Sequence, residues 1–491
     1  MKRVAQVLTS ALLSSMLAAC MTVGPDYKVP DNAAVKDSAA NGPFQGTDHA
    51  AVSIAPVPDD WWRLYDDPHI DTLVRQALAA NTDLRVAVAN LKRSIAVYHE
   101  VESENWPQGA IHGSAARGLL AAEPLLKEER LPTLNFGDAG FEISYLIDFF
   151  GKLARADEAA LASAQASQAA LDQARVGVVA ETVRAYVQGC TATHELHVAQ
   201  YQLDLQQRSV GIAQKLVDAG RGQPTDVLRA QAQADALRAT LPRFRAEQEG
   251  AAYRLAVMLG KPPTAFDVSS VACEAPPQLR QALPVGDGAA LLKRRPDVRQ
   301  AERELASATA RIGVVTADLY PSIRIGASAG YSGILEHLGQ SQTAHWNIGP
   351  AISWNLPTNG TRSRIHATEA SAEGALAHFD GVVLKALRET QTALSAYTHE
   401  LERNQALRAA RDKAAEAARQ NRMLYTAGRS PYLSSLDADR TLASNDAALA
   451  ASDAQVAMDQ INLFLALGGG WQHAAEMAGH KEAPAEQVSA E

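Results

Sequence analysis

Few side chains in this chain of 491 residues are spaced in a way that could support chemistry. The segment Gly326-Ala327-Ser328-Ala329-Gly330 matches the pattern of a nucleophile elbow, which requires a turn between a strand and a helix. Ser328 lies instead inside a segment of alternating character, so we expect no catalytic serine there. The 13 histidines form no metal-ligand spacing, and the sequence has no phosphate-binding loop. We therefore expect no enzyme activity, no metal and no cofactor.

The first of three cysteines, Cys20, follows a stretch typical of a secretory signal. Lys2 and Arg3 precede a short apolar stretch that ends in Leu17-Ala18-Ala19. This ending resembles a bacterial lipobox, in which the cysteine is acylated and becomes the first residue. Met21 stands where lipoproteins retained at the inner membrane carry Asp, which indicates anchoring in outer-membrane lipid. The alternative is an ordinary signal that ends in a cysteine.

Cys190 and Cys273 remain as the thiols of the mature chain. An oxidising periplasm would permit a disulfide between them, clamping the mid-chain linker onto a long helix. Two free buried thiols are the open alternative.

Composition excludes some classes of protein. Lys and Arg number 46 against 55 Asp and Glu, a net charge of −9, so no basic surface suggests nucleic-acid binding. After residue 20 no apolar run reaches the ~18 residues of a membrane helix. Any crossing of a bilayer must therefore be made by strands.

The sequence contains two related halves. Leu216-Val217-Asp218-Ala219-Gly220-Arg221 is echoed by Leu424-Tyr425-Thr426-Ala427-Gly428-Arg429 at an offset of 208 residues. Trp106-Pro107 corresponds in the same way to Tyr320-Pro321 at an offset of 214. We interpret the halves as tandem repeats with one architecture.

Each repeat is expected to contain two strands long enough to cross a bilayer. After each aromatic-proline pair, apolar residues alternate with polar or small residues over about 9–10 positions, as in the wall of a barrel with lipid outside and water inside. A soluble hairpin with one wet face would show the same alternation. The segments are 108–117, which alternates weakly, 141–148, 323–331 and 347–356.

Two long proline-free helices argue against a soluble hairpin. Lys152–Val217 and Arg362–Ala427 each contain 66 residues and would each span ~100 Å. Shorter helices return beside them, and Pro242 should bend or break one of these. Such rods would form part of a cylinder wall, and an open four-stranded sheet leaves its edges unpaired in lipid. Several chains must close the wall, and three would give ~12 strands.

We divide the chain by these patterns into ten segments. They are a signal peptide (1–19), a lipidated arm (20–59), periplasmic helices (60–105), a membrane hairpin (106–150), a helical hairpin (151–260), a linker (261–285), a periplasmic helix (286–320), a second membrane hairpin (321–358), a second helical hairpin (359–470) and a flexible tail (471–491).

Several short motifs are distributed along nearly the whole mature chain: Val23-Gly24-Pro25-Asp26-Tyr27, Trp61-Trp62, Arg294-Arg295-Pro296-Asp297-Val298, Asp318-Leu319-Tyr320-Pro321 and Leu465–Trp471. With these motifs the chain resembles the TolC-like outer membrane factors, specifically the NodT-type efflux lipoproteins of pumps driven by resistance-nodulation-division transporters.

The resemblance implies an α+β membrane protein that forms a homotrimer. Four strands per protomer would build a β-barrel of about 12 strands, continuous with a long periplasmic α-helical barrel made of the two repeats. The channel would be the passive exit duct of a tripartite pump, with no catalytic residues. A periplasmic adaptor, or membrane fusion protein, would join it to the inner-membrane transporter.

The resemblance also implies an aperture at the helical tip. The family motif is present from Tyr425 to Arg440, and within it Leu433, Asp437 and Arg440 share one helix face. Leu433 would form an apolar constriction, and Asp437 a charged ring paired with Arg440 that attracts cations. The alternative is a solvated helix face with a routine ion pair. The adaptor would contact the helix turns at Gly220, Arg221, Gly428 and Arg429.

Two other functions remain open at this point. One is a pore-free periplasmic adaptor or scaffold lipoprotein with long helical hairpins, and the other is an exit duct for secreted proteins. The doubled hairpin and the four membrane-length strands favour the efflux duct in the outer membrane.

Overall fold

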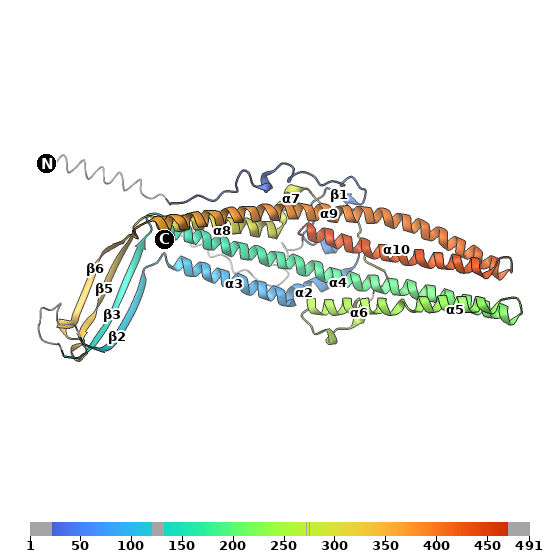
Figure 1. Cartoon of the computed structure of the whole chain (residues 1–491), viewed down its shortest axis with the longest axis horizontal. Coiled ribbons are helices and arrows are strands. Elements are labelled where there is room, and N and C mark those ends of the chain that lie inside the picture. The colour runs from blue at the N-terminus through green and yellow to red at the C-terminus, as the bar shows by residue number, and fades with distance from the viewer. Residues whose placement is uncertain (1–21, 120–131, 272, 274, 470–491) are drawn as a thin grey trace. The chain divides into compact units, whose positions relative to one another are not determined.

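The computed structural model describes residues 22–119, 132–271, 273 and 275–469 (Figure 1). The signal peptide, Cys20 and the tail from residue 471 lie outside the described residues. The helices are α2 (Pro68–Ala80), α3 (Thr82–Ser103), α4 (Lys152–Asp218), α5 (Pro224–Arg238), α6 (Leu241–Met258), α7 (Gly288–Arg294), α8 (Pro296–Ala317), α9 (Asn359–Thr426) and α10 (Tyr432–Ala466). The strands are β1 (Val52–Ser53), β2 (Gln108–Gly118), β3 (Leu134–Ile147), β4 (Leu283–Pro284), β5 (Ser322–Ile334) and β6 (Ala344–Ser353).

The chain divides into two compact units. The first, here called the sheet unit, draws its described residues from 22–30, 90–168 and 300–379. The second, here called the tip unit, draws them from 31–89, 169–299 and 380–469. Both long helices, α4 and α9, contribute residues to both units.

An antiparallel sheet with strand order β2-β3-β5-β6 forms the core of the sheet unit (Figure 1). Its registers run without interruption, from Gln108 paired with Ser144 to Tyr331 paired with Ala344. Directly paired residues point to the same face of a sheet, so the register assigns every strand residue to one of two faces.

Small residues let the helices of the sheet unit approach closely. Ser163 of α4 and Ser307 of α8 lie 2.9 Å apart through their hydroxyls, and Ser307 also donates to the Ala159 carbonyl at 2.9 Å. Small side chains such as serine let the two helix backbones approach this closely.

The tip unit contains the ends of the long helices and the helices that return from them. The expected break at Pro242 is confirmed, because α5 ends at Arg238 and α6 begins at Leu241 with the proline in its first turn. An aromatic core lies at the far end of α10, where Trp61 stacks on Phe464 with ring centroids 4.5 Å apart. Within the described residues, no helix combines the length and the apolar character that crossing a membrane requires.

Candidate functional site

The sheet has one strongly apolar face that is open to its surroundings. Ile111 is 87% exposed and Trp346 77% exposed, values far outside the range of core residues. The register places these two side chains on the same face as most of the other large apolar residues of the strands. This face matches the lipid-facing wall of a membrane barrel. Its other exposed large members are Phe141, Ile143, Tyr145, Ile325, Tyr331, Ile348 and Ile352, and the half-buried Ile147 and Ile323 lie on the same face.

The opposite face carries mainly small and polar residues, with Leu134, Phe136, Leu146 and Ile334 as its large apolar members near the strand ends. Ser328 lies on it in the middle of β5, where its hydroxyl accepts a hydrogen bond from the Asn347 side chain at 2.8 Å. A Cβ at Gly330 would lie 2.5 Å from the Ala139 carbonyl oxygen, so this glycine lets neighbouring backbones approach. The segment that resembled a nucleophile elbow is therefore a packing feature of the sheet.

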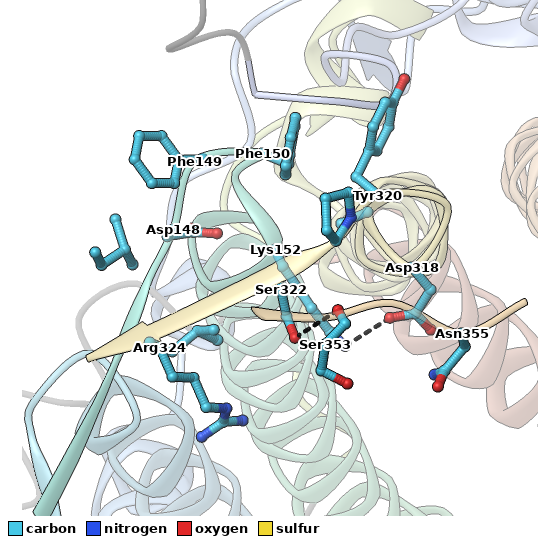
Figure 2. Close-up of a pocket in the computed structure, with 14 residues that line it drawn as sticks. Asp148, Phe149, Phe150, Lys152, Asp318, Tyr320, Ser322, Arg324, Ser353 and Asn355 are labelled. Carbon is cyan, nitrogen blue, oxygen red and sulfur yellow. Dashed lines mark hydrogen bonds and ion pairs between the residues drawn. The ribbon is translucent and has the colours of Figure 1, made fainter. Parts of the chain in front are cut away.

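A cavity of about 150 Å³ lies where the strands meet the helices, within the sheet unit (Figure 2). Phe150 and Tyr320, the latter from one of the repeated aromatic-proline pairs, stack here with ring centroids 4.5 Å apart. Lys152 at the start of α4 pairs with Asp318 at 2.7 Å. Arg324 also lines the cavity, and its guanidinium extends away from the Lys152–Asp318 pair.

The first described residues of the arm are fixed to the sheet unit by Arg155 of α4. The Arg155 side chain is only 5% exposed and donates to the Val23 carbonyl at 3.1 Å, the Gly24 carbonyl at 3.3 Å and the Asp26 carboxylate at 2.6 Å. A Cβ at Gly24, whose φ is +87°, would lie 2.4 Å from the Cα of Gly313 in α8. The motif after the predicted lipidated cysteine is thus a docking segment, and sequence reasoning missed Arg155, its partner.

The same backbone motif ends both long helices. Gly220 and Gly428 have φ angles of +68° and +69°. The following amide, of Arg221 or Arg429, donates back five residues to a helix carbonyl at 2.8 and 2.9 Å. This is the Schellman geometry, which a glycine adopts without strain. The two turns lie close together, because a Cβ at Gly428 would be 3.3 Å from the Arg221 guanidinium.

The expected aperture residues share one exposed face of α10. Leu433 is 56% exposed, and Asp437 and Arg440 are also exposed, whereas Leu436 is buried on the opposite side. Within one chain Arg440 makes a different contact from the expected pair with Asp437, since its Nε donates to the Gln233 side chain at 2.9 Å. The Arg440 contact therefore joins α10 to α5.

Two acids behind this face, the half-buried Asp439 and the buried Asp446, were not found from the sequence. Asp439 lies 3.3 Å from Arg422, and burial raises the pKa of its carboxyl to about 6. Asp446 is 8% exposed and accepts hydrogen bonds from Gln202 of α4 and from Arg411 of α9. Asp446 thus connects three helices drawn from both repeats.

The arginine-proline-aspartate motif has a structural role at the far end of α10. Arg294 and Arg295 donate to the carbonyls of Leu467 and Ala466 at 2.8 Å each. Pro296 begins α8, and Asp297 accepts from the Arg295 guanidinium at 2.6 Å. The two arginines satisfy carbonyls that the end of a helix leaves without partners.

Cys190 of α4 and Cys273 of the linker are joined by a disulfide in the structure, with Cα atoms 5.0 Å apart. The bridge closes a sequence separation of 83 residues. Beside it, a Cβ at Gly189 would lie 2.5 Å from Val271, so the linker contacts the helix closely at this point.

Comparison with known proteins agrees with this geometry. The family described as "Outer membrane efflux protein" matches residues 73–261 and 289–469. Nodulation protein T of Rhizobium leguminosarum bv. viciae is 27% identical over 97% of this chain and 96% of its own length. Outer membrane protein OprJ of Pseudomonas aeruginosa is 27% identical over 96% of this chain and 98% of its own length. The solved structure of the outer-membrane channel OprN is 34% identical, with a TM-score of 0.85 over 92% of this chain and 99% of that one.

These matches confirm the family resemblance and the α+β fold class of outer-membrane channels predicted from the sequence. They favour the efflux duct over a pore-free scaffold, because the relatives are channel proteins of efflux systems. The chain therefore belongs to the outer membrane efflux protein family, and it is a NodT-type efflux channel of the outer membrane.

Proposed function

We propose that three copies of this chain close their sheets into one barrel of about 12 strands. The carrying observation is the sheet itself, which has one apolar face, one polar face and two edge strands, β2 and β6. Edge strands in lipid leave backbone groups without partners, and pairing β2 of one protomer with β6 of the next removes both edges. The apolar face then contacts lipid and the polar face lines the lumen.

The long helices α4 and α9 and their returning partners form the periplasmic duct in this assembly. The segments assigned from the sequence take matching roles: 106–150 and 321–358 build the membrane wall, and 151–260 and 359–470 build the duct. The linker 261–285 joins the repeats, clamped to α4 by the disulfide between Cys190 and Cys273. Acylation of Cys20 anchors the arm in outer-membrane lipid.

The channel acts without catalysis, as the exit duct of a tripartite pump for small toxic compounds. An inner-membrane transporter of the resistance-nodulation-division type supplies the energy, and a periplasmic adaptor joins it to the duct. The adaptor contacts the turns at Gly220, Arg221, Gly428 and Arg429, which lie at the ends of the long helices.

Leu433 and Asp437 narrow the periplasmic end of the duct. Their exposure on one face of α10 supports this role, since side chains that meet their symmetry mates across a threefold axis are exposed in a single chain. Three apolar side chains obstruct hydrated solutes, and three carboxylates attract cations.

Reconstitution of the purified, full-length protein tests the proposal. Planar bilayers should show discrete single-channel conductance, and native mass spectrometry in detergent should show a trimer. A monomer that remains soluble after removal of its acyl chains, or bilayers without conductance, would refute the proposal.

A further inference from the structure

We propose that Arg324 forms a ring of three guanidinium groups in the lumen, one from each protomer, that attracts organic anions. The inference rests on the proposed closure of three sheets into one barrel. It adds an anion-selective element to a chain whose net charge is −9.

Arg324 lies on the polar face of the sheet, near the helix-proximal end of β5. Its direct partners in the register are Leu146 of β3 and Ala351 of β6. Ile323 and Ile325, its neighbours along the strand, point to the opposite, apolar face. Closure of the barrel therefore directs the Arg324 guanidinium into the lumen rather than into lipid.

The assembly brings no acid beside Arg324 within the sheet. The strand order β2-β3-β5-β6 makes β5 an inner strand, so both flanking strands belong to the same chain. Neighbouring protomers would join only at β2 and β6. Leu146 and Ala351 therefore flank the guanidinium in the trimer as they do in the single chain, and neither can neutralise its charge.

Acids near the cavity are already engaged by other groups. Asp148 accepts a hydrogen bond from the Ala154 amide in the first turn of α4 at 3.0 Å. Asp318 pairs with Lys152 at 2.7 Å and with Arg364 at 3.4 Å. Among the described residues, Arg324 has no ion-pair partner, and it is exposed. Three cations (Lys152, Arg324 and Arg364) face two acids (Asp148 and Asp318) here. This leaves one excess positive charge per chain where the strands meet the helices.

The solutes favoured by such a ring are carboxylates and sulfonates. A guanidinium binds these groups through paired hydrogen bonds. The cavity beside Arg324 gives a solute access to it, and the Ser353 hydroxyl at its wall can donate to an anion. The Ser322 hydroxyl donates instead to the Ser353 carbonyl at 3.3 Å.

Reversal potentials in planar bilayers test the ring, with KCl and potassium benzoate as the two salts. Three unit charges about one Debye length from a permeating ion, ~10 Å in 0.1 M salt, change the local ratio of anions to cations by about fivefold. Arg324→Gln should lower the anion-to-cation permeability ratio by about that factor in ~0.1 M salt. In ~1 M salt, where the Debye length is ~3 Å, the variant and the wild type should agree.

Two further variants separate charge from structure. Arg324→Lys keeps the charge and should retain the wild-type ratio. Arg117→Gln removes the same charge from β2, where the register places Arg117 on the apolar face opposite Asn135, and should leave the ratio unchanged. Equal unitary conductance in ~1 M salt shows that each variant forms the channel.

The outcomes distinguish the ring from the duct. A wild-type protein without conductance would refute the proposed channel and the ring with it. A conducting channel whose permeability ratio is the same with Arg324→Gln as in the wild type would refute the ring alone.

Discussion

Replacing Arg155 with Met should release the arm from the sheet unit. The variant keeps an apolar stem in the buried site but removes the donors that hold the carbonyls of Val23 and Gly24. A hydrogen bond from a charged donor contributes about 1.5–3 kcal/mol. The Asp26 side chain is 83% exposed, so its ion pair adds little. Two bonds at the lower limit give a loss of about 3 kcal/mol in arm docking.

Hydrogen exchange of the arm measures this loss directly. The Val23 amide donates to the Phe150 carbonyl at 3.0 Å, so its protection depends on the docked arm. A loss of about 3 kcal/mol corresponds to exchange faster by ~100-fold, while amides of the sheet should keep their rates. Arg311→Met is the matched control, because Arg311 lies exposed on α8. Equal protection of the arm in Arg155→Met and in the wild type would refute the role of this side chain.

Three further predictions concern the tip unit and the disulfide. Burial raises the pKa of Asp439 to about 6, so its ionised form destabilises the folded tip above that pH. The free energy of unfolding should therefore rise by ~1.4 kcal/mol as the pH falls from 7 to 5. Asp439→Asn should remove this part of the pH dependence, as measured by denaturant unfolding. Cys273→Ser should cost up to ~4.5 kcal/mol of unfolding free energy, given the separation of 83 residues, and should match the reduced wild type; equal stability of the variant and the oxidised wild type would contradict the bridge. Gly428→Ala, at a φ of +69°, should lower the free energy of unfolding by about 1–2 kcal/mol. Gly374→Ala inside α9, where a Cβ meets open space, should instead raise it by up to ~1 kcal/mol. Equal shifts for both variants in thermal unfolding would contradict the glycine cap at the end of α9.

The helices and turns could be predicted closely because their determinants are local. A proline-free run bounded by a glycine predicts 152–217, and α4 spans Lys152–Asp218. The second run predicts 362–427, and α9 spans Asn359–Thr426. Helix propensity and a left-handed cap depend on residues a few positions apart, so a single sequence contains the information needed.

The strands were predicted less evenly. Strong alternation marks β5 and β6, whereas 108–117 alternates weakly and still forms β2, Gln108–Gly118. Its pairing with β3 holds it in place, and glycines at positions such as Gly113 contribute no apolar side chain to a pattern. Tertiary pairing here supplies what the local sequence does not.

Contacts between distant parts of the chain could not be predicted. Arg155 binds residues about 130 positions away, and Asp446 accepts from Gln202 at a separation of 244 residues. No local pattern marks an arginine or an aspartate for such a partner. The resemblance identified the motif at Arg294 and Arg295, but only the structure relates it to the end of α10.

If Leu433 and Asp437 narrow the duct as proposed, divergence between the two repeats explains why only one helix tip of each protomer, that of α10, does so. At the offset of 208 residues, Asp437 corresponds to Arg229 and Leu433 to Thr225, so the first repeat lacks both the acid and the apolar side chain. Leu436 is 1% exposed, whereas its counterpart Leu228 is 65% exposed, so the two helices also present different faces. Six identical helices would bring six acids together in a trimer, and the like charges would repel. In the proposed trimer, divergence reduces these to three acids, and α5 instead holds α10 through the bond from Arg440 to Gln233.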